Sequence, residues 1–147
     1  MIVIGVGTPF RHDDGAGPAV VDALRDRTPP GVTLAVTDGE PARLIELWAG
    51  ADLAVVVDAV RADPPRPGRV HEFHDAVADD GHGHVTGHGL GLGAAVELAR
   101  ALDRMPAHLH VYAIEGTDFS LGLGLTPPVA ASVRRVADLI TPDGAPP

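Results

Sequence analysis

Residues 2–17, IVIGVGTPFRHDDGAG, decide the fold of this 147-residue chain. The apolar run from Ile2 to Val6 has the length of a strand, and the loop after it carries Asp13 and Asp14 before a helix begins. A strand, a polar loop and a helix start in this order form the first β-α unit of an α/β protein. We therefore expect this loop to hold a functional carboxylate.

The rest of the chain continues the same alternation. Leu53 to Val57 is a continuous apolar run, typical of a parallel strand covered on both faces. Residues 69–74 alternate polar with apolar and predict an edge strand, whose antiparallel orientation stays open. The other expected strands are 32–36 and 108–114. The expected helices are 18–27, 41–48 with Trp48 in the core, one buried through Ala95, Val96, Ala99 and Leu102, and a last one reaching Ile140.

These elements predict an α/β fold, a three-layer α/β/α sandwich around a mostly parallel twisted sheet of about five strands. The length suits one core, so we expect a single domain over residues 1–140 and a flexible tail over 141–147. If the strand order near the start is 2-1-3, the first and third strands flank the point where strand order reverses. Ligands of open α/β sheets bind at that point.

The composition excludes several classes of function. The net charge is −9 and all 11 basic residues are scattered arginines, which argues against nucleic-acid binding. The absence of cysteine excludes disulfides and thiolate sites, and the absence of lysine excludes a Schiff base. No apolar run reaches the ~20 residues of a membrane span. We expect a cytoplasmic protein without a membrane contact and, given its acidity and the lack of an obvious apolar patch, a monomer.

The sequence places three candidate ligands at one edge of the expected sheet. Asp14 follows the first strand, Asp58 follows the third, and His88 lies in a later glycine-rich loop. Each has an ordinary explanation, since the aspartates can cap a helix or a turn and a loop histidine is usually solvated. Together they form an oxygen, oxygen and nitrogen set suited to a divalent metal with open positions.

Three other kinds of site fit the sequence less well. A dinucleotide site would need a third glycine where Phe10 stands, and Asp13 and Asp14 would repel a pyrophosphate. A zinc site built from the histidines of the 79–91 loop matches no structural zinc spacing; its ligands would be His82, His84 and His88, with Asp79 or Asp80 as the fourth. Neither serine of the chain lies in a G-x-S-x-G motif, which argues against a serine-triad hydrolase.

Four motifs, in order along nearly the whole chain, together resemble those of the hydrogenase maturation proteases. They are IGVGTPxRxDDGAG from residue 4, VVVDAV from 55, TGHGLGL from 86 and IEGTDFSLGLGLTPPV from 114. These endopeptidases remove a carboxyl-terminal extension from the large subunit of nickel-iron hydrogenases after nickel insertion. The chain departs from the usual family pattern at Thr8, where asparagine is common, and at Glu40-Pro41, where the family usually has Gly-Thr.

The resemblance implies a site and a partner. Asp14, Asp58 and His88 would contact nickel, which the precursor of the large subunit would supply, and no organic cofactor is implied. The sequence leaves two catalytic roles open: the metal could act as a Lewis acid toward water or the carbonyl group, or a carboxylate, Asp14 or Asp38, could act as general base. The segments 61–68 and 116–125 lie where they could form a docking rim. The alternatives are a repurposed homologue that acts as a non-proteolytic metal-binding or nucleotide-binding module, or a metallohydrolase of small substrates.

Overall fold

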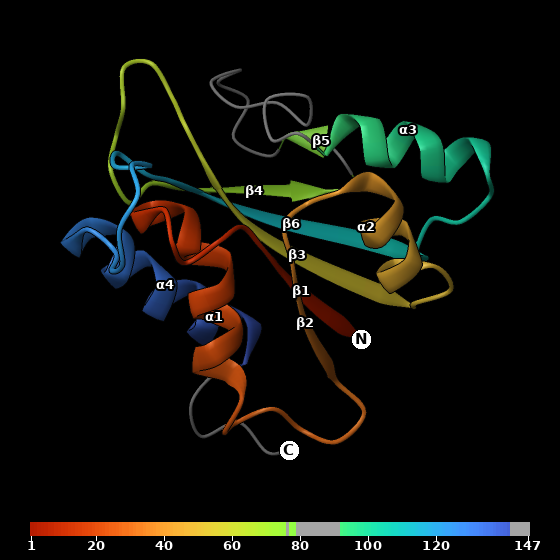
Figure 1. Ribbon diagram of the computed structural model, residues 1–147. Helices are drawn as coiled ribbons and strands as arrows, with labels where there is room; N and C mark the ends of the chain where they lie inside the picture. The colour runs from red at the N-terminus through yellow and green to blue at the C-terminus, as the bar shows by residue number, and fades with distance from the viewer. Residues whose placement is uncertain (76, 79–91, 142–147) are drawn as a thin grey trace.

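A computed structural model describes residues 1–75, 77–78 and 92–141. Its sheet has the order β2-β1-β3-β6-β4-β5, with β1, β2, β3 and β6 parallel and β4 antiparallel to β6 (Figure 1). The predicted 2-1-3 order and the mostly parallel sheet are confirmed. The strands are β1 (Ile2–Val6), β2 (Thr33–Thr37), β3 (Leu53–Val60), β4 (Val70–His74), β5 (Val77–Ala78) and β6 (His108–Glu115).

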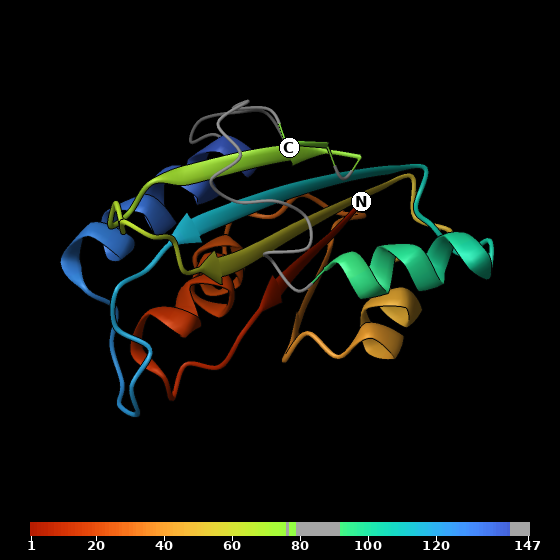
Figure 2. The ribbon, with the colours of Figure 1, turned by 90° about the horizontal axis from the view of Figure 1, so that it is seen from above.

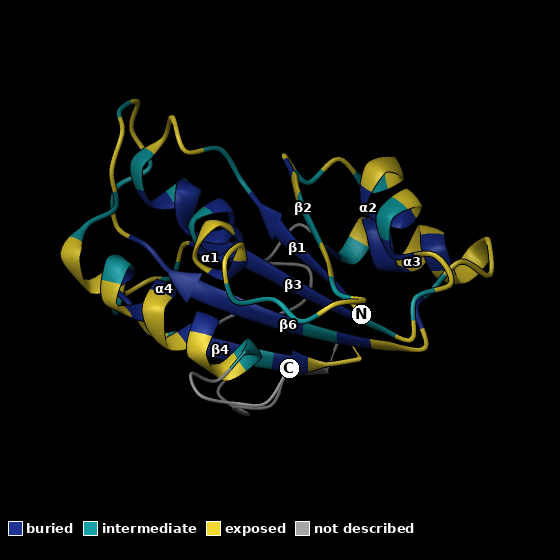
Figure 3. Cartoon of the chain, turned by 90° about the horizontal axis from the view of Figure 1, so that it is seen from below, coloured by how far each residue is buried: buried dark blue, intermediate teal, exposed yellow. Residues whose placement is uncertain are grey.

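Helices cover both faces of the sheet, which confirms the three-layer sandwich (Figures 1 and 2). One core lies between the sheet and α1 (Ala16–Leu24) with α4 (Pro127–Ile140). The other lies between the sheet and α2 (Pro41–Trp48) with α3 (Gly93–Ala101), where Trp48 is fully buried as predicted. The central strands are buried along nearly their whole length (Figure 3). Within the described ranges, no helix is long and apolar enough to cross a membrane.

Several boundaries differ from the sequence-based expectation. β3 continues to Val60, so Asp58 lies inside the strand, where it is paired with Ala113, and does not follow it. The expected edge strand, β4, carries the two-residue β5 on its outer side. Leu102 was expected in the buried stripe of α3, but the helix ends one residue earlier and this side chain is exposed. Of the expected tail, only Thr141 falls within the described residues.

The first turn of α1 crosses the sheet at backbone contact. A Cβ atom placed on Gly17 would lie 2.5 Å from the carbonyl oxygen of Val57 and 2.6 Å from the backbone nitrogen and oxygen of Val6. A Cβ on Gly5 would collide with the carbonyl of Gly17 from the other side. Two glycines therefore let the helix start lie directly on β1 and β3. This contact fixes the position of the short 3-10 helix η1 (His12–Gly15) just before it.

We predict that Gly17→Ala destabilises the protein by about 1–3 kcal/mol, because the added methyl group meets backbone atoms that cannot turn away. A loss of stability would indicate the backbone contact, since alanine in place of glycine inside a helix otherwise stabilises by up to about 1 kcal/mol. Urea unfolding measures the change. Ala23→Leu, at an exposed position of the same helix, serves as the control and should stay within about 0.5 kcal/mol of the wild type. A Gly17→Ala protein as stable as the wild type would contradict the contact.

Candidate active site at the β1–β3 switch point

A cleft of about 290 Å³ opens at the carboxyl ends of β1, β2 and β3. It is lined by three aspartates from three different chain segments and by small or apolar residues: Asp14, Asp38, Asp58, Val6, Gly7, Gly39, Ala59 and Leu92. A second cavity of about 330 Å³ shares Asp14 and Ala59 with the first and extends towards Arg11, Arg61 and Phe119. The two cavities meet at Asp14, so the site is an elongated crevice with an acidic end and a basic end.

Asp14 lies in η1 and is half-buried. Its Oδ2 accepts a hydrogen bond from the backbone N–H of Thr8 at 2.9 Å, which turns the carboxylate back over the loop. The suggestion that Asp14 caps the first helix is wrong, because Gly15 occupies the cap position of α1 and no side chain caps it. Gly7 has φ of +132°, and a side chain there would collide with the backbone carbonyl of Asp14. The family motif thus needs glycine here to bring Asp14 close to β1.

Asp58 is the deepest carboxylate of the cleft, with 7% of its surface exposed. The pKa of Asp58 is raised to about 7, because burial, the largest cause, and the negative charge of Asp14 together outweigh a hydrogen bond from the backbone of Ala59 that lowers it. The two carboxylates are therefore close enough to interact electrostatically. A cation in the cleft would relieve this repulsion and would favour the ionised form of Asp58.

Asp38 lies in the turn between β2 and α2. Its Oδ1 accepts a hydrogen bond from the N–H of Glu40 at 3.1 Å. Glu40 in turn caps α2 by accepting from the N–H groups of Ala42 and Arg43, both at 3.1 Å. With Pro41 at the start of the helix, the Glu-Pro pair that departs from the family motif forms a complete helix start. The departure therefore leaves Asp38 at the cleft.

Asp13 has a structural role that the sequence did not reveal. Its buried carboxylate accepts hydrogen bonds from the N–H groups of Thr117, Asp118 and Thr126 at 2.8–3.1 Å and from the Thr126 hydroxyl. Burial alone would raise the pKa of Asp13, but these donors hold it below the ordinary value of 3.8. Asp13 thus fastens the 116–126 loop to the loop after β1, and these loops run side by side in Figures 1 and 2. No spacing rule separates this role from that of Asp14.

A third buried carboxylate, Glu115, ends β6. It accepts from Nε2 of His71 at 2.6 Å and from the N–H of Arg66 at 2.8 Å, with the Arg66 guanidinium at 3.4 Å. Burial raises the pKa of Glu115, but the bonds from His71 and Arg66 outweigh it and leave the pKa lowered. The glutamate of the IEG motif therefore holds the 61–68 segment against the sheet. The motif is visible in the sequence, but this pairing is not, because His71 lies 44 residues away.

The structure brings together Asp14, Asp38 and Asp58 of the predicted site residues. His88, the third expected metal contact, lies outside the described residues. The same holds for the ligands of the rival zinc site, which are Asp79, Asp80, His82 and His84. The described part of the site is therefore a set of carboxylates around a small cleft, and this charge favours a cation or a polar backbone group over an anion.

Comparison with known proteins gives one consistent result. The family model described as hydrogenase maturation protease matches residues 18–143, a span that begins just after η1. The fold is similar to that of the hydrogenase maturating endopeptidase HybD from Escherichia coli, with a TM-score of 0.77 and 23% identity over 95% of this chain and 88% of that chain. It is also similar to a nickel-iron hydrogenase maturation protease, HybD from Thermococcus kodakarensis, with a TM-score of 0.70 and 24% identity over 95% of both chains. Among curated protein sequences, none matches significantly.

We predict that Asp13→Asn lowers the free energy of unfolding at pH 7 by about 2–4 kcal/mol, because the amide nitrogen would face N–H donors. The folded-state pKa lies below the unfolded value of ~3.9, so the carboxylate stabilises the fold above that pH. This stabilisation is lost as pH falls through the folded-state pKa. The difference in free energy of unfolding between the wild type and the variant, measured by urea unfolding, should therefore become smaller at acid pH.

The exposed Asp22→Asn serves as the matched control and should change stability by less than about 0.5 kcal/mol. Equal stability of Asp13→Asn and the wild type at pH 7 would show that Asp13 does not anchor the loops.

Proposed function

This chain belongs to the hydrogenase maturation protease family, a family of hydrolases, and we propose that it removes the carboxyl-terminal extension of a nickel-iron hydrogenase large subunit after nickel insertion. The observation that carries the proposal is the convergence of Asp14, Asp38 and Asp58 on one cleft at the switch point of the sheet. Each comes from a different β-α unit, so the fold itself assembles the set.

Asp14 and Asp58, together with His88, are proposed to contact nickel that is already seated in the precursor. The donor chemistry fits, because two carboxylates and an imidazole suit a borderline divalent ion. The electrostatics fit as well, since the raised pKa of Asp58 reports a buried carboxylate beside a like charge. Nickel is thus part of the substrate here. The three residues would recognise a precursor whose metal insertion is complete and would position its scissile peptide beside the cleft.

Asp38 is our candidate for the general base that accepts a proton from the attacking water. It is exposed, it lines the cleft, and the Glu40 N–H fixes one of its carboxylate oxygens. Asp14 is the other candidate base, but as a nickel contact it would have less capacity to accept a proton. This division assigns recognition to Asp14 and Asp58 and proton transfer to Asp38.

The basic end of the crevice provides a surface for the rest of the precursor. Leu121 and Leu123 flank Gly122, whose N–H donates to the carbonyl of Phe10 at 2.9 Å. The side chains of Leu121, Leu123 and Phe10 are more than half exposed, at 76%, 72% and 65% respectively. In the adjoining cavity, the Arg61 guanidinium lies 4.5 Å from the centre of the Phe119 ring. We propose that this apolar rim, Phe10, Leu121 and Leu123, docks the large subunit next to the cleft.

We predict that Asp14→Asn, Asp58→Asn and His88→Ala each slow cleavage of a nickel-loaded precursor roughly a hundredfold or more, because a misplaced peptide loses its alignment with the base. Asp38→Asn should lower kcat by about 10²–10⁴-fold without weakening precursor binding. Single-turnover cleavage and a separate binding measurement distinguish the two effects.

Asp22→Asn removes an exposed carboxylate of α1 far from the cleft and should cleave at the wild-type rate. If the three nickel-contact variants also cleave at that rate, the assignment of Asp14, Asp58 and His88 is wrong. If only Asp38→Asn cleaves normally, the base lies elsewhere.

We predict that replacing Leu121 and Leu123 together by serine raises KM for the precursor roughly tenfold with little change in kcat, because the lost contacts bind substrate and transition state equally. Leu139→Ser, which alters an exposed leucine of α4, is the control and should leave KM unchanged. An unchanged KM for the double variant, with its fold verified by circular dichroism, would exclude the rim as a docking surface.

A further inference from the structure

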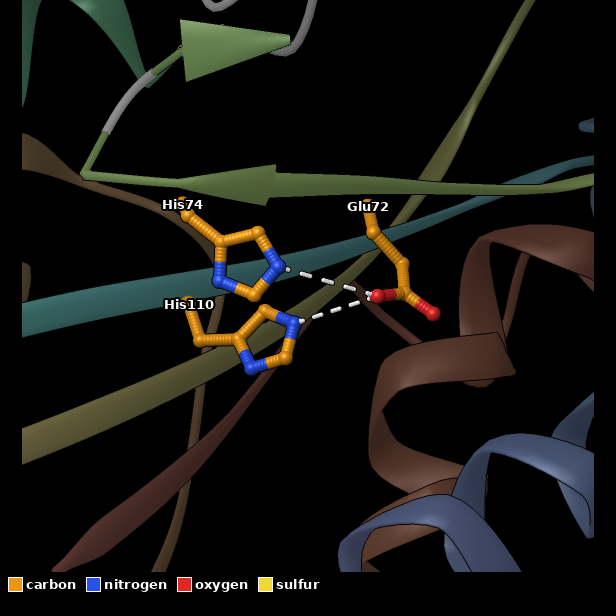
Figure 4. Close-up of side chains that lie close together, drawn as sticks. All are labelled: Glu72, His74 and His110. Atoms are coloured by element: carbon orange, nitrogen blue, oxygen red, sulfur yellow. Dashed lines mark ion pairs between the residues drawn. The ribbon is translucent and has the colours of Figure 1, made fainter. Parts of the chain in front are cut away.

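A second cluster of potential ligands lies on the two strands β4 and β6, away from the aspartate cleft. It consists of Glu72, His74 and His110, whose ligand atoms all lie within 4.8 Å of one another (Figure 4). Oε2 of Glu72 is 3.8 Å from Nε2 of His74 and 3.6 Å from Nε2 of His110. In the figure, Nε2 of both histidines faces the same carboxylate oxygen of Glu72. None of these residues belongs to the nickel-contact set proposed above.

Strand register explains why the three side chains meet. His74 and His110 are direct cross-strand partners, and Glu72 lies two residues before His74 on the same face. Asp58 is paired with Ala113, which is paired with His71, so these residues share the opposite face of the sheet. The cluster therefore faces the side of α1 and α4, whereas Asp58 faces the side of α2 and α3. A ligand in one site cannot contact the other.

The His110 ring contacts two other rings. The centres of the His74 and His110 rings are 4.1 Å apart, and the His110 ring lies 4.5 Å from that of Tyr112. Tyr112 is buried, so it forms a fixed wall behind His110. Glu72 is the direct cross-strand partner of Tyr112, so its side chain lies on the same face of the sheet as this ring. Strands β6 and β4 thus orient two of the potential ligands, His110 and Glu72.

We propose that Glu72, His74 and His110 bind one divalent transition-metal ion of the zinc class. In a tetrahedral zinc site, bonds of about 2.0–2.1 Å place the ligand atoms about 3.3 Å apart. The observed 3.6 and 3.8 Å reach that spacing through small rotations of Glu72 and His74, which are partly exposed and able to move. Two imidazoles with one carboxylate favour zinc, nickel or copper over magnesium and calcium, which prefer all-oxygen sites.

Such an ion would join β4 to β6. These strands are antiparallel neighbours, and β4 is followed in the sheet by the two-residue edge strand β5. Three protein ligands leave a fourth position for water, which suits a site that opens to solvent on one side. The inference is independent of the proposed protease function, because the two sites use different residues on different faces.

The test is calorimetric titration of metal-free protein with Zn²⁺, in a full-length background that carries His82→Ala, His84→Ala and His88→Ala. This background removes the loop histidines, which could bind zinc by themselves. Glu72→Gln, His74→Ala and His110→Ala are each added to it. We expect the background protein to bind one equivalent and each cluster variant to bind at least tenfold more weakly, because one of three ligands is lost.

His108→Ala is the matched control, since His108 is an exposed histidine on the same strand outside the cluster. It should leave the affinity unchanged. Zn²⁺ at a hundredfold excess over its Kd should also raise the Tm of the background protein by roughly 5–10 °C, and Mg²⁺ should not. Glu72→Gln keeps the shape of a partly exposed side chain and so tests the site even if a histidine variant unfolds. Equal zinc affinity in all three cluster variants, or no zinc binding by the background protein, would overturn the proposal.

Discussion

The structure depends on one backbone crossing, where the start of α1 lies on β1 and β3 with no side chain between them. Gly5 and Gly17 make this contact possible, because a Cβ atom at either position would overlap backbone atoms. Helix and strand backbones are usually kept apart by a layer of side chains, so this approach is unusually close. Its consequence is that η1, and with it Asp14, is brought over the carboxyl ends of β1 and β3. Gly5 and Gly17 of the first motif thus allow the close approach of helix and strands.

The second constraint is that the two loops bordering the crevice form one unit. Backbone hydrogen bonds link His12 with Gly122 and Asp13 with Asp118. The Asp13 carboxylate accepts further hydrogen bonds from backbone N–H groups of the same loop. The exposed apolar rim is therefore carried on a hydrogen-bonded pair of loops. This supports the docking role proposed for the rim, because a rim held by hydrogen bonds loses little conformational entropy on docking. The hydrogen bonds between the two loops then fix the position of the rim relative to the cleft.

The sequence predicted the layers, the strand order near the switch point and the convergence of Asp14 with Asp58, because these follow from periodicity and from parallel topology. It misplaced the end of β3, since an aspartate inside a buried strand contradicts the rule that strands end at polar residues. It missed the roles of Asp13 and Glu115, whose partners are 44 to 113 residues distant in the chain. It also missed the exposed apolar rim, because the buried or exposed state of a leucine in a glycine-rich loop has no periodic signature.

The contrast between Asp13 and Asp14 shows how the fold selects a functional carboxylate. Both are ionisable groups in adjacent positions of one short helix, yet Asp13 receives four donor groups, from Thr117, Asp118 and Thr126. An ionised carboxylate can accept about four hydrogen bonds, so Asp13 has no capacity left for a ligand. Among the described residues, Asp14 receives one N–H, from Thr8, and faces a buried carboxylate. A cation would satisfy the remaining lone pairs of Asp14 and offset its repulsion of Asp58, which supports the metal contact that we propose for this residue.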